Sequence, residues 1–350
     1  MPHQAGPPHS TSAGQTASSG NGSVPSSPVH LSGIIHADAP APFTIDDLLV
    51  FDDDALHHLF GGEQCRFDLV ELAIALRGAS PDLVSRLRPQ LPPERRLLFD
   101  GALERPRTED QTRRARKHLL DELFWDLTYW KTPHLYSELA DGEEFHPGIF
   151  RNLAAIIYGS DIADIAAGGG RATFQALRMG AKHVWAIEPS PGLRRIISLK
   201  AVAYAATPAL TLLPGYFDAL PLPDNSVDVT LSCSAFTSGT GQGGEAGLVE
   251  MQRVTRPGGW IVLIWPRPED YAWLAVRGFQ RLTLPVQTPL RLRFRSMAMA
   301  LRLARYFYPA NTRILTYLNR HQRPEVPYSL VGNNPPHVFC LRQVVKPASS

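Results

Sequence analysis

Residues 161–177, which read DIADIAAGGGRATFQAL, constrain the fold of this chain more than any other stretch. An apolar run meets three consecutive glycines and then a segment with helical periodicity. In parallel α/β sheets, ligands bind where a strand ends and the following helix begins. One glycine is enough for a tight turn, whereas three in a row indicate that the backbone passes close to a ligand. The stretch therefore predicts a strand, a ligand-binding loop and a helix.

The residues around this loop alternate between strand-like and helix-like patterns. Strands are expected at 160–167, 183–189, 209–215, 226–236 and 260–265, and helices at 171–180, 192–206 and 244–259. Strands that alternate with helices predict a mostly parallel sheet covered on both faces. We therefore expect an α/β, Rossmann-like fold with its ligand at the carboxyl ends of the strands.

The glycine loop also limits the class of ligand. A dinucleotide fingerprint needs a third glycine after Gly168 and Gly170, and Thr173 stands at that position. That glycine allows close packing of helix and strand over a pyrophosphate, so its absence counts against NAD and FAD. A phosphate-binding P-loop is excluded because no Gly-Lys-Ser/Thr follows.

S-adenosylmethionine fits the loop better because it has no pyrophosphate. Asp164 stands four residues before Gly168, where a carboxylate can meet the ammonium group of such a ligand. Glu188 ends the second expected strand, 18 residues past Gly170, and can accept both ribose hydroxyls. NAD enzymes share an acid at this place, so Glu188 alone does not discriminate between the two ligands.

Two further stretches resemble a known family. LPLPDNSVDVTLSCSAF, at 220–236, and VEMQRVTRPGGWIVLIW, at 249–265, are similar to segments of class I SAM-dependent methyltransferases, most of all the ubiquinone and menaquinone biosynthesis type. The resemblance implies a Rossmann-like sheet, S-adenosylmethionine as cofactor and methyl transfer as the reaction.

The resemblance also implies roles for individual residues. In the family pattern, the methionine portion of the cofactor is held by Asp164, Ala166, Gly168 and Gly170, the ribose by Glu188 with Pro189 and Ser190, the adenine by Tyr216, Phe217 and Asp218, and the transferred methyl group is faced by Ser232 to Phe236. Two positions depart from the pattern. Ala166 replaces the first glycine of the loop, and Tyr216 stands where the family has an acid, with Asp218 two residues late.

The acceptor side is expected in 126–148 and in the segment after residue 270. Tyr136 and His146 are candidate catalytic bases or orienting groups, although the aromatic residues of this region can equally pack a helical module onto the sheet. A base is needed only if the acceptor is a hydroxyl or an acidic carbon. His57 and His58 are expected on the surface.

The net charge of +2 is unevenly distributed. Residues 271–324 contain ten arginines and no Asp or Glu. Arg291, Arg293 and Arg295 alternate as the side chains of a strand would, which favours a bound anionic group such as phosphate or carboxylate. The alternative is a solvated basic face.

The chain before residue 131 has two parts. Residues 1–40 are rich in Ser, Gly, Pro and Thr, which predicts a disordered tail. Residues 41–130 show helical periodicity, and Thr108 with Gln111 predicts a capping box at the start of an amphipathic helix. Residues 43–123 of this all-α module resemble the C-terminal helical module of the flagellar motor switch protein FliG, which implies contacts with a protein partner.

The expected organisation is a tail at 1–40, the helical module at 41–130 and a methyltransferase domain at 131–345. The cofactor core spans about 150–270, and a basic segment covers 271–345. We expect a bacterial enzyme that methylates a small, possibly anionic acceptor. Open alternatives are a nucleic-acid or protein methyltransferase, and a non-catalytic SAM-binding scaffold that acts through the helical module.

Location and metal content are also constrained by the sequence. Cys65, Cys233 and Cys340 form no CxxC pair, which favours a reducing compartment and predicts no metal site. No apolar run reaches the roughly 18–20 residues of a membrane span, and no signal peptide is evident. A cytoplasmic protein is therefore expected.

Overall fold

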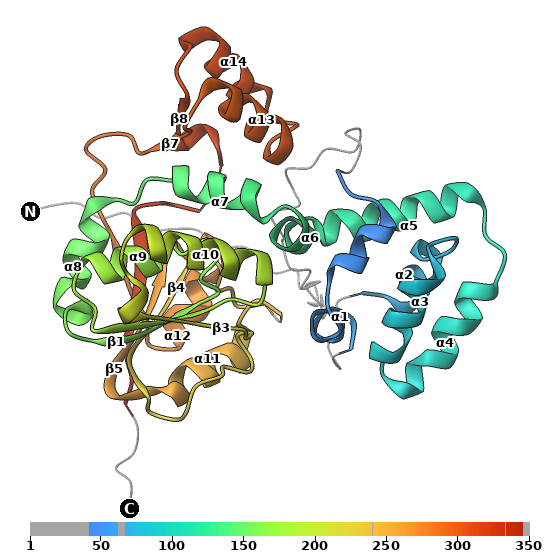
Figure 1. Ribbon diagram of the computed structural model, residues 1–350, viewed down its shortest axis with the longest axis horizontal. Helices are drawn as coiled ribbons and strands as arrows, with labels where there is room; N and C mark the ends of the chain where they lie inside the picture. Colours follow the sequence, from blue (N-terminus) through green and yellow to red (C-terminus); the bar gives the residue numbers. More distant parts are fainter. Residues whose placement is uncertain (1–41, 62–66, 240, 333, 346–350) are drawn as a thin grey trace, which may run out of the picture.

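The protein is described by a computed structural model that covers residues 42–61, 67–239, 241–332 and 334–345. A helical body and a body built on a sheet lie side by side (Figure 1). The tail expected at residues 1–40 lies outside the described residues.

The helical body is made of short, capped helices. Its elements are η2 Ile45–Val50, α1 Asp53–Phe60, α2 Leu69–Ala75, α3 Pro81–Leu87, η3 Arg88–Gln90, α4 Pro93–Glu104 and α5 Glu109–Glu122. The side chains of Asp52 and Asp68 accept hydrogen bonds from backbone N–H groups in the first turns of α1 and α2. Thr108 and Gln111 form the predicted capping box at the start of α5.

A break at Leu123 separates α5 from the next helix. Leu123 has φ −92° and ψ 8°, and α6 Phe124–Lys131 starts directly after it. The sequence predicts one continuous amphipathic helix here because the apolar spacing continues across the break. α7 Pro133–Gly142 and α8 Pro147–Ile157 then lead the chain to the sheet.

The second body contains a seven-stranded sheet. Its strands are β1 Asp161–Ile165, β2 His183–Ile187, β3 Leu210–Leu213, β4 Val227–Cys233, β5 Thr255–Ile264, β6 Gln280–Thr283 and β9 Val338–Gln343. They are ordered β3-β2-β1-β4-β5-β9-β6, and β9 runs in the direction opposite to the other six strands of this sheet. The order reverses between β1 and β4, so the loops after these two strands meet at the switch point. The predicted mostly parallel sheet is confirmed.

Helices cover both faces of this sheet (Figure 1). The remaining elements around it are α9 Arg171–Arg178, α10 Pro191–Ala203, η4 Thr207–Ala209, α11 Gly244–Val254, η5 Pro268–Asp270 and α12 Tyr271–Val276. Ile162 packs with α8 and α9, whereas Ala163 packs with α11 on the other face, as the alternation of a strand requires. The segment TRPGG, expected to end a helix, instead begins β5 at Thr255.

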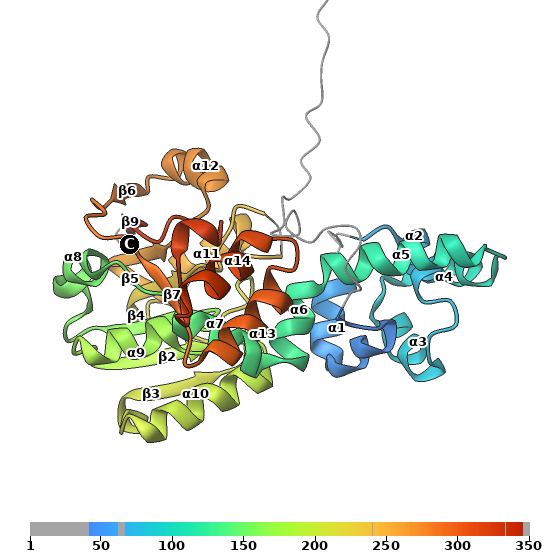
Figure 2. The same ribbon diagram turned by 90° about the horizontal axis from the view of Figure 1, so that it is seen from above.

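An insertion between β6 and β9 folds by itself into a small layer. It consists of β7 Arg291–Arg293, α13 Met297–Phe307, α14 Thr312–His321, β8 Glu325–Pro327 and η6 Tyr328–Leu330, with β7 and β8 paired antiparallel. Figure 1 shows α13 and α14 above α7, and Figure 2 gives the same layer seen from above. None of the helices in the described part of the chain is long and apolar enough to cross a membrane.

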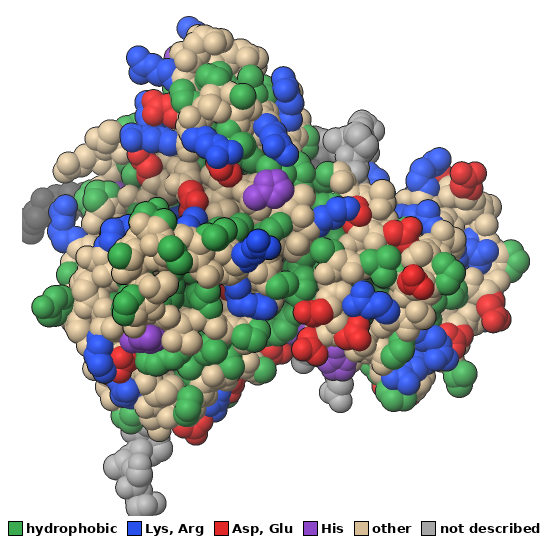
Figure 3. All heavy atoms as spheres, in the orientation of Figure 1, with side chains coloured by type: hydrophobic (Ala, Val, Ile, Leu, Met, Phe, Trp, Pro, Cys, Tyr) green, Lys and Arg blue, Asp and Glu red, His purple; other side chains and the backbone are tan. Residues whose placement is uncertain are grey.

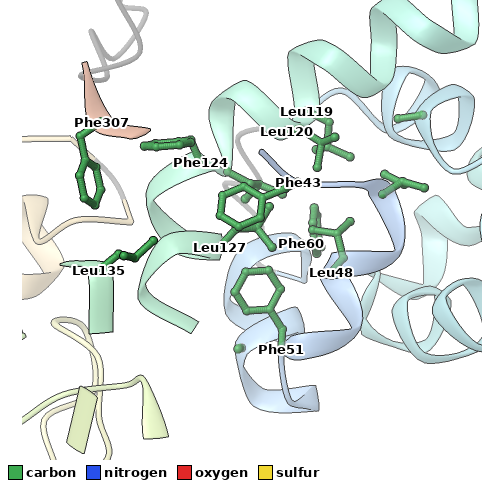
Figure 4. Packing of buried hydrophobic residues seen from close by; sticks show 14 of the residues in the cluster. Phe43, Leu48, Phe51, Phe60, Leu119, Leu120, Phe124, Leu127, Leu135 and Phe307 are labelled. Atoms are coloured by element: carbon green, nitrogen blue, oxygen red, sulfur yellow. The ribbon is translucent and has the colours of Figure 1, made fainter. Parts of the chain in front are cut away.

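One apolar core joins the helical body to this insertion. Buried residues from 43–139 and from 292–331 belong to a single cluster (Figure 4). Phe307 of α13 stacks on Trp125 of α6 at 5.4 Å between ring centroids and also lies against Phe124 at 6.3 Å. The helical body and the insertion are therefore held together by residues that lie far apart in the sequence.

Candidate functional site

The loop after β1 adopts the conformation that its glycines predict. Ala166, Gly168 and Gly170 have φ values of 56°, 58° and 82°. A left-handed conformation costs a non-glycine residue about 1–2 kcal/mol, so Ala166 is a strained position of the kind that gathers at functional sites. A Cβ on residue 168 would lie 3.2 Å from the Tyr136 ring of α7, so the loop passes directly beneath this helix.

Glu188 closes the neighbouring strand, β2. Its carboxylate is 4% exposed and accepts hydrogen bonds from the N–H groups of Gly168 and Ser190, each at 2.9 Å. Burial raises the pKa of Glu188 to about 7, although these two N–H groups act in the opposite direction. Each oxygen keeps a second lone pair, so the carboxylate can still accept from two hydroxyls of a ligand.

Asp164 and Ser232 place two unsatisfied polar atoms at the switch point. Asp164, 1% exposed, accepts from the Thr173 hydroxyl at 2.5 Å through Oδ2. Its Oδ1 and the Ser232 Oγ are buried and have no hydrogen-bond partner among the described residues. Burial raises the pKa of Asp164 to about 6. Buried polar atoms are rarely left without partners, so this pair on neighbouring strands fits a ligand that carries donor groups.

Lys200 fixes the glycine loop from α10. Its ammonium donates to the Gly169 carbonyl at 2.9 Å, to the Ser137 hydroxyl at 3.0 Å and to Asp141 at 2.7 Å. The loop is thus joined to α7 by one cation. Nothing in the sequence pattern marked Lys200, because its partners come from segments far apart in the chain.

A buried arginine lies on the other side of the loop, near the end of β4. Arg171 donates to Glu143 at 2.5 Å, and its guanidinium lies over the rings of Phe145 and Trp265 at 4.9 and 4.3 Å from their centroids. Its Nη2 is 3.6 Å from the Cys233 sulfur. Burial raises the pKa of the Cys233 thiol to about 12, so the thiol is protonated at neutral pH. Trp265, at the end of β5, has φ 57°.

The two candidate catalytic residues have different surroundings. Tyr136 lies at the glycine loop, 4.7 Å from the Tyr129 ring, and burial raises the pKa of its phenol well above the usual range. His146 instead caps α8: its Nδ1 accepts from the Gly148 N–H at 3.1 Å, and its Nε2 lies 3.1 Å from the Pro285 carbonyl. Both ring nitrogens of His146 are therefore engaged in structural contacts.

Residues 216–218 and 189–190 border the end of β2. Ser190 caps α10 and donates to the Tyr129 carbonyl at 2.7 Å, while the Pro189 carbonyl accepts from an arginine of α10. Phe217 packs against Phe236 at 5.6 Å, and Asp218 is exposed. Tyr216 stacks on His58 of α1 at 3.9 Å. The sequence placed His58 on the surface, and only its neighbour His57 is exposed.

The fold and the site agree with a comparison to known protein families. Residues 163–263, which run from β1 to β5, match the family model of a methyltransferase domain. Residues 163–263 of this chain therefore resemble a methyltransferase domain. The cofactor of such a domain is S-adenosylmethionine, and the buried carboxylates and unsatisfied polar atoms at the strand ends fit it.

Known proteins similar to the methyltransferase domain include uncharacterized methyltransferases of Mycobacterium tuberculosis and Mycobacterium bovis. Each is 31% identical over 118 residues, which are 33% of this chain and 44% of the relative. The chain thus spans less than half the length of these relatives. Solved structures that align include a SAM-dependent methyltransferase from Aquifex aeolicus (19% identity, 43% of this chain and 89% of that one, TM-score 0.36) and the [4+2]-cyclase SpnF (13%, 63% and 94%, TM-score 0.41).

Three arginines of the insertion, next to the methyltransferase domain, have carboxylate partners. Arg291 pairs with Glu325 at 2.9 Å, Arg293 with Glu144 at 2.9 Å, and Arg295 with Glu138 at 3.0 Å. Figure 3 shows basic side chains over the insertion with acidic ones between them. The acid-free stretch of sequence is thus partly neutralised by acids from other segments.

Proposed function

We propose that this chain transfers the methyl group of S-adenosylmethionine to a small-molecule acceptor. The observation that carries the proposal is the pair of buried carboxylates, Asp164 and Glu188, at the ends of adjacent strands. Burial raises the pKa of both, which is an unfavourable arrangement unless a ligand with donor groups binds there. The unsatisfied Ser232 hydroxyl lies on the third strand of the same edge.

Different residues of this edge would bind different parts of the cofactor. Glu188 would accept from the ribose hydroxyls, and Asp164 would face the ammonium group. Gly168 and Gly170 let the backbone approach the methionine portion, since a side chain at 168 would meet Tyr136. S-adenosylmethionine supplies an electrophilic methyl group, so the protein has mainly to orient the acceptor and exclude water.

The enclosure of the acceptor side supports a small acceptor. Trp265, directly after β5, and Tyr328 of the insertion are 1% and 5% exposed, and their rings lie 5.8 Å apart. Tyr136 covers the glycine loop from α7. A nucleic-acid strand or a protein loop would need this covering to open widely, whereas a small molecule would not.

Proton chemistry at this site is limited by the raised pKa values. The Tyr136 phenol and the Cys233 thiol are both held in their protonated forms by burial. They can donate a hydrogen bond and orient an acceptor, but at neutral pH they are poor bases. This favours an acceptor whose nucleophilic atom needs no deprotonation, with catalysis by alignment.

Calorimetry with S-adenosylmethionine and S-adenosylhomocysteine tests the proposal. The wild-type protein should bind both, and Glu188→Ala should abolish binding. Glu245→Ala is the matched control, because Glu245 is an exposed acid of α11 that pairs with Arg277. Labelled S-adenosylmethionine and a panel of small acceptors would then identify the substrate. A folded protein that binds neither ligand would rule out the proposal. If the ligand binds but the methyl group is transferred only to protein or nucleic acid, the acceptor is not a small molecule.

A further inference from the structure

A close ring pair lies between the helical body and the cofactor domain. His58 of α1 and Tyr216, after β3, stack with centroids 3.9 Å apart and an interplanar angle of 17°. The two residues lie far apart in the sequence, one in α1 and the other after β3. Aromatic pairs in this geometry add attraction beyond the surface that they bury.

Tyr216 belongs to the wall of the proposed adenosine site. It follows β3, whose last residue, Leu213, accepts a hydrogen bond from the Glu188 N–H at 3.0 Å. Residue 216 begins a tight turn in which the Ala219 N–H donates to the Tyr216 carbonyl at 3.3 Å. The half-buried Tyr216 ring therefore stands beside the strand end that carries Glu188.

The position of His58 is set by the core of the helical body. Leu56 and Phe60 of α1 are fully buried, and the Asp52 side chain caps the helix. The helix that follows the helical body, α6, is held to the sheet domain at the Ser190 hydroxyl, which donates to the Tyr129 carbonyl at 2.7 Å. Burial and the nearby charges of α1 and its cap raise the pKa of the Tyr216 phenol, so its hydroxyl stays protonated.

We propose that His58 is a positioning residue for the adenosine half of the cofactor. By stacking on Tyr216, it holds that ring beside Glu188, and the cofactor site is complete only with the helical body in place. This inference rests on the proposed function, because it assumes that S-adenosylmethionine binds at Glu188.

Calorimetric titration of four proteins tests it: wild type, His58→Ala, His58→Phe and His57→Ala. His58→Ala should raise the Kd about three- to tenfold, equally for S-adenosylmethionine and S-adenosylhomocysteine, because both carry adenosine. His58→Phe should keep the stack and stay within about twofold of wild type. His57→Ala is the matched control, since His57 is the exposed neighbour on the same helix, and should bind as wild type does.

A second pair of variants separates positioning from a general loss of structure. Tyr216→Leu removes the same stack from the other side. If His58 acts through Tyr216, the double variant His58→Ala/Tyr216→Leu should bind no more weakly than Tyr216→Leu alone. In the apo protein, the His58 ring protons should show an upfield NMR shift that disappears in Tyr216→Leu.

Three results would overturn the inference while leaving the proposed function intact. These are unchanged binding in His58→Ala, tighter binding in that variant, or additive losses in the double variant. If the wild-type protein binds neither ligand, both the proposed function and the inference that depends on it are wrong.

Discussion

The Tyr136 ring lies across Gly168. Its Cε1 atom and its hydroxyl are each 3.2 Å from the place where a Cβ on residue 168 would be. Gly168 also has φ 58°, so two independent features of the site require glycine at this position.

Gly168→Ala should weaken S-adenosylmethionine binding more than tenfold and lower the Tm. The control is Gly159→Ala at the opposite end of β1, where φ is 72° and a Cβ would meet nothing within 4 Å. The control carries the same backbone strain, about 1–2 kcal/mol, and should lower the Tm without changing the Kd. Calorimetry measures the Kd of both variants, and thermal unfolding measures their Tm. Equal Kd values in Gly168→Ala and Gly159→Ala would show that the close approach to Tyr136 has no role in binding.

Cofactor binding should strengthen as pH rises from 6 to 8. Glu188 has a pKa of about 7, and only its ionised form accepts from two hydroxyls. Its carboxylate is roughly one-tenth ionised at pH 6, so the Kd should be about tenfold higher there than at pH 8. Asp164, with a pKa of about 6, adds to the same trend. In Glu188→Gln, binding should be weak and nearly independent of pH above 7; a full tenfold pH dependence there would assign it to another group.

The free energy of unfolding of the apo protein should fall as pH rises, whereas cofactor binding strengthens. Burial raises the pKa of Glu188 above its ordinary value of 4.5, so the folded state favours the protonated acid. Its contribution to the free energy of unfolding is fully present below pH 4.5 and is lost as pH rises through about 7. In urea unfolding, the free energy of unfolding of the wild type relative to Glu188→Ala should therefore be constant below pH 4.5 and fall as pH rises from 4.5 to about 7.

The Arg171–Glu143 pair should behave as a coupled unit. Both side chains are largely buried, at 13% and 10% exposure. Arg171→Met removes the guanidinium from a buried carboxylate and should cost about 3–5 kcal/mol, whereas adding Glu143→Leu should recover much of that cost. The exposed pair Arg113–Asp110 is the control, where Arg113→Met should cost less than about 1 kcal/mol. Additive losses in the double variant would contradict this coupling.

Phe307→Ala should weaken the helical body, although Phe307 lies at the far end of the chain. It is 4% exposed in the shared core, and its loss should cost about 3–5 kcal/mol. Amide hydrogen exchange should accelerate in α5 and α13. Phe279→Ala is the control, because Phe279 is equally well buried in a core beneath the sheet. Unchanged exchange in α5 would show that the two bodies open independently.

Much of the methyltransferase domain could be predicted from the sequence. Its strands are short apolar runs with turn signals, and the loop at Gly168 and Gly170 depends on glycines that no local alternative explains. Asp164 and Glu188 could be found because their distance from that loop along the chain is set by one strand and one helix. The roles of these residues remain predictions that the binding experiments test.

The features that could not be predicted depend on contacts between distant segments. Arg171 and Glu143 meet through α7 and α9, and nothing at either position shows the partner. The surrounding sequence predicts the same surface position for His58 and His57. Only the placement of α1 against Tyr216 distinguishes the two residues. The resemblance of residues 43–123 to the FliG module also stays a prediction, because short helices with ordinary caps are compatible with many helical folds.

The core shared by the two ends of the chain has a consequence for synthesis. Phe307 leaves the ribosome roughly 180 residues after Phe124, and translation at ~5–20 residues per second makes this delay roughly 10–40 s. During that time the helices of the helical body expose apolar surface that the insertion later covers. The core of the helical body is thus completed only after the whole sheet domain up to β6 has been translated.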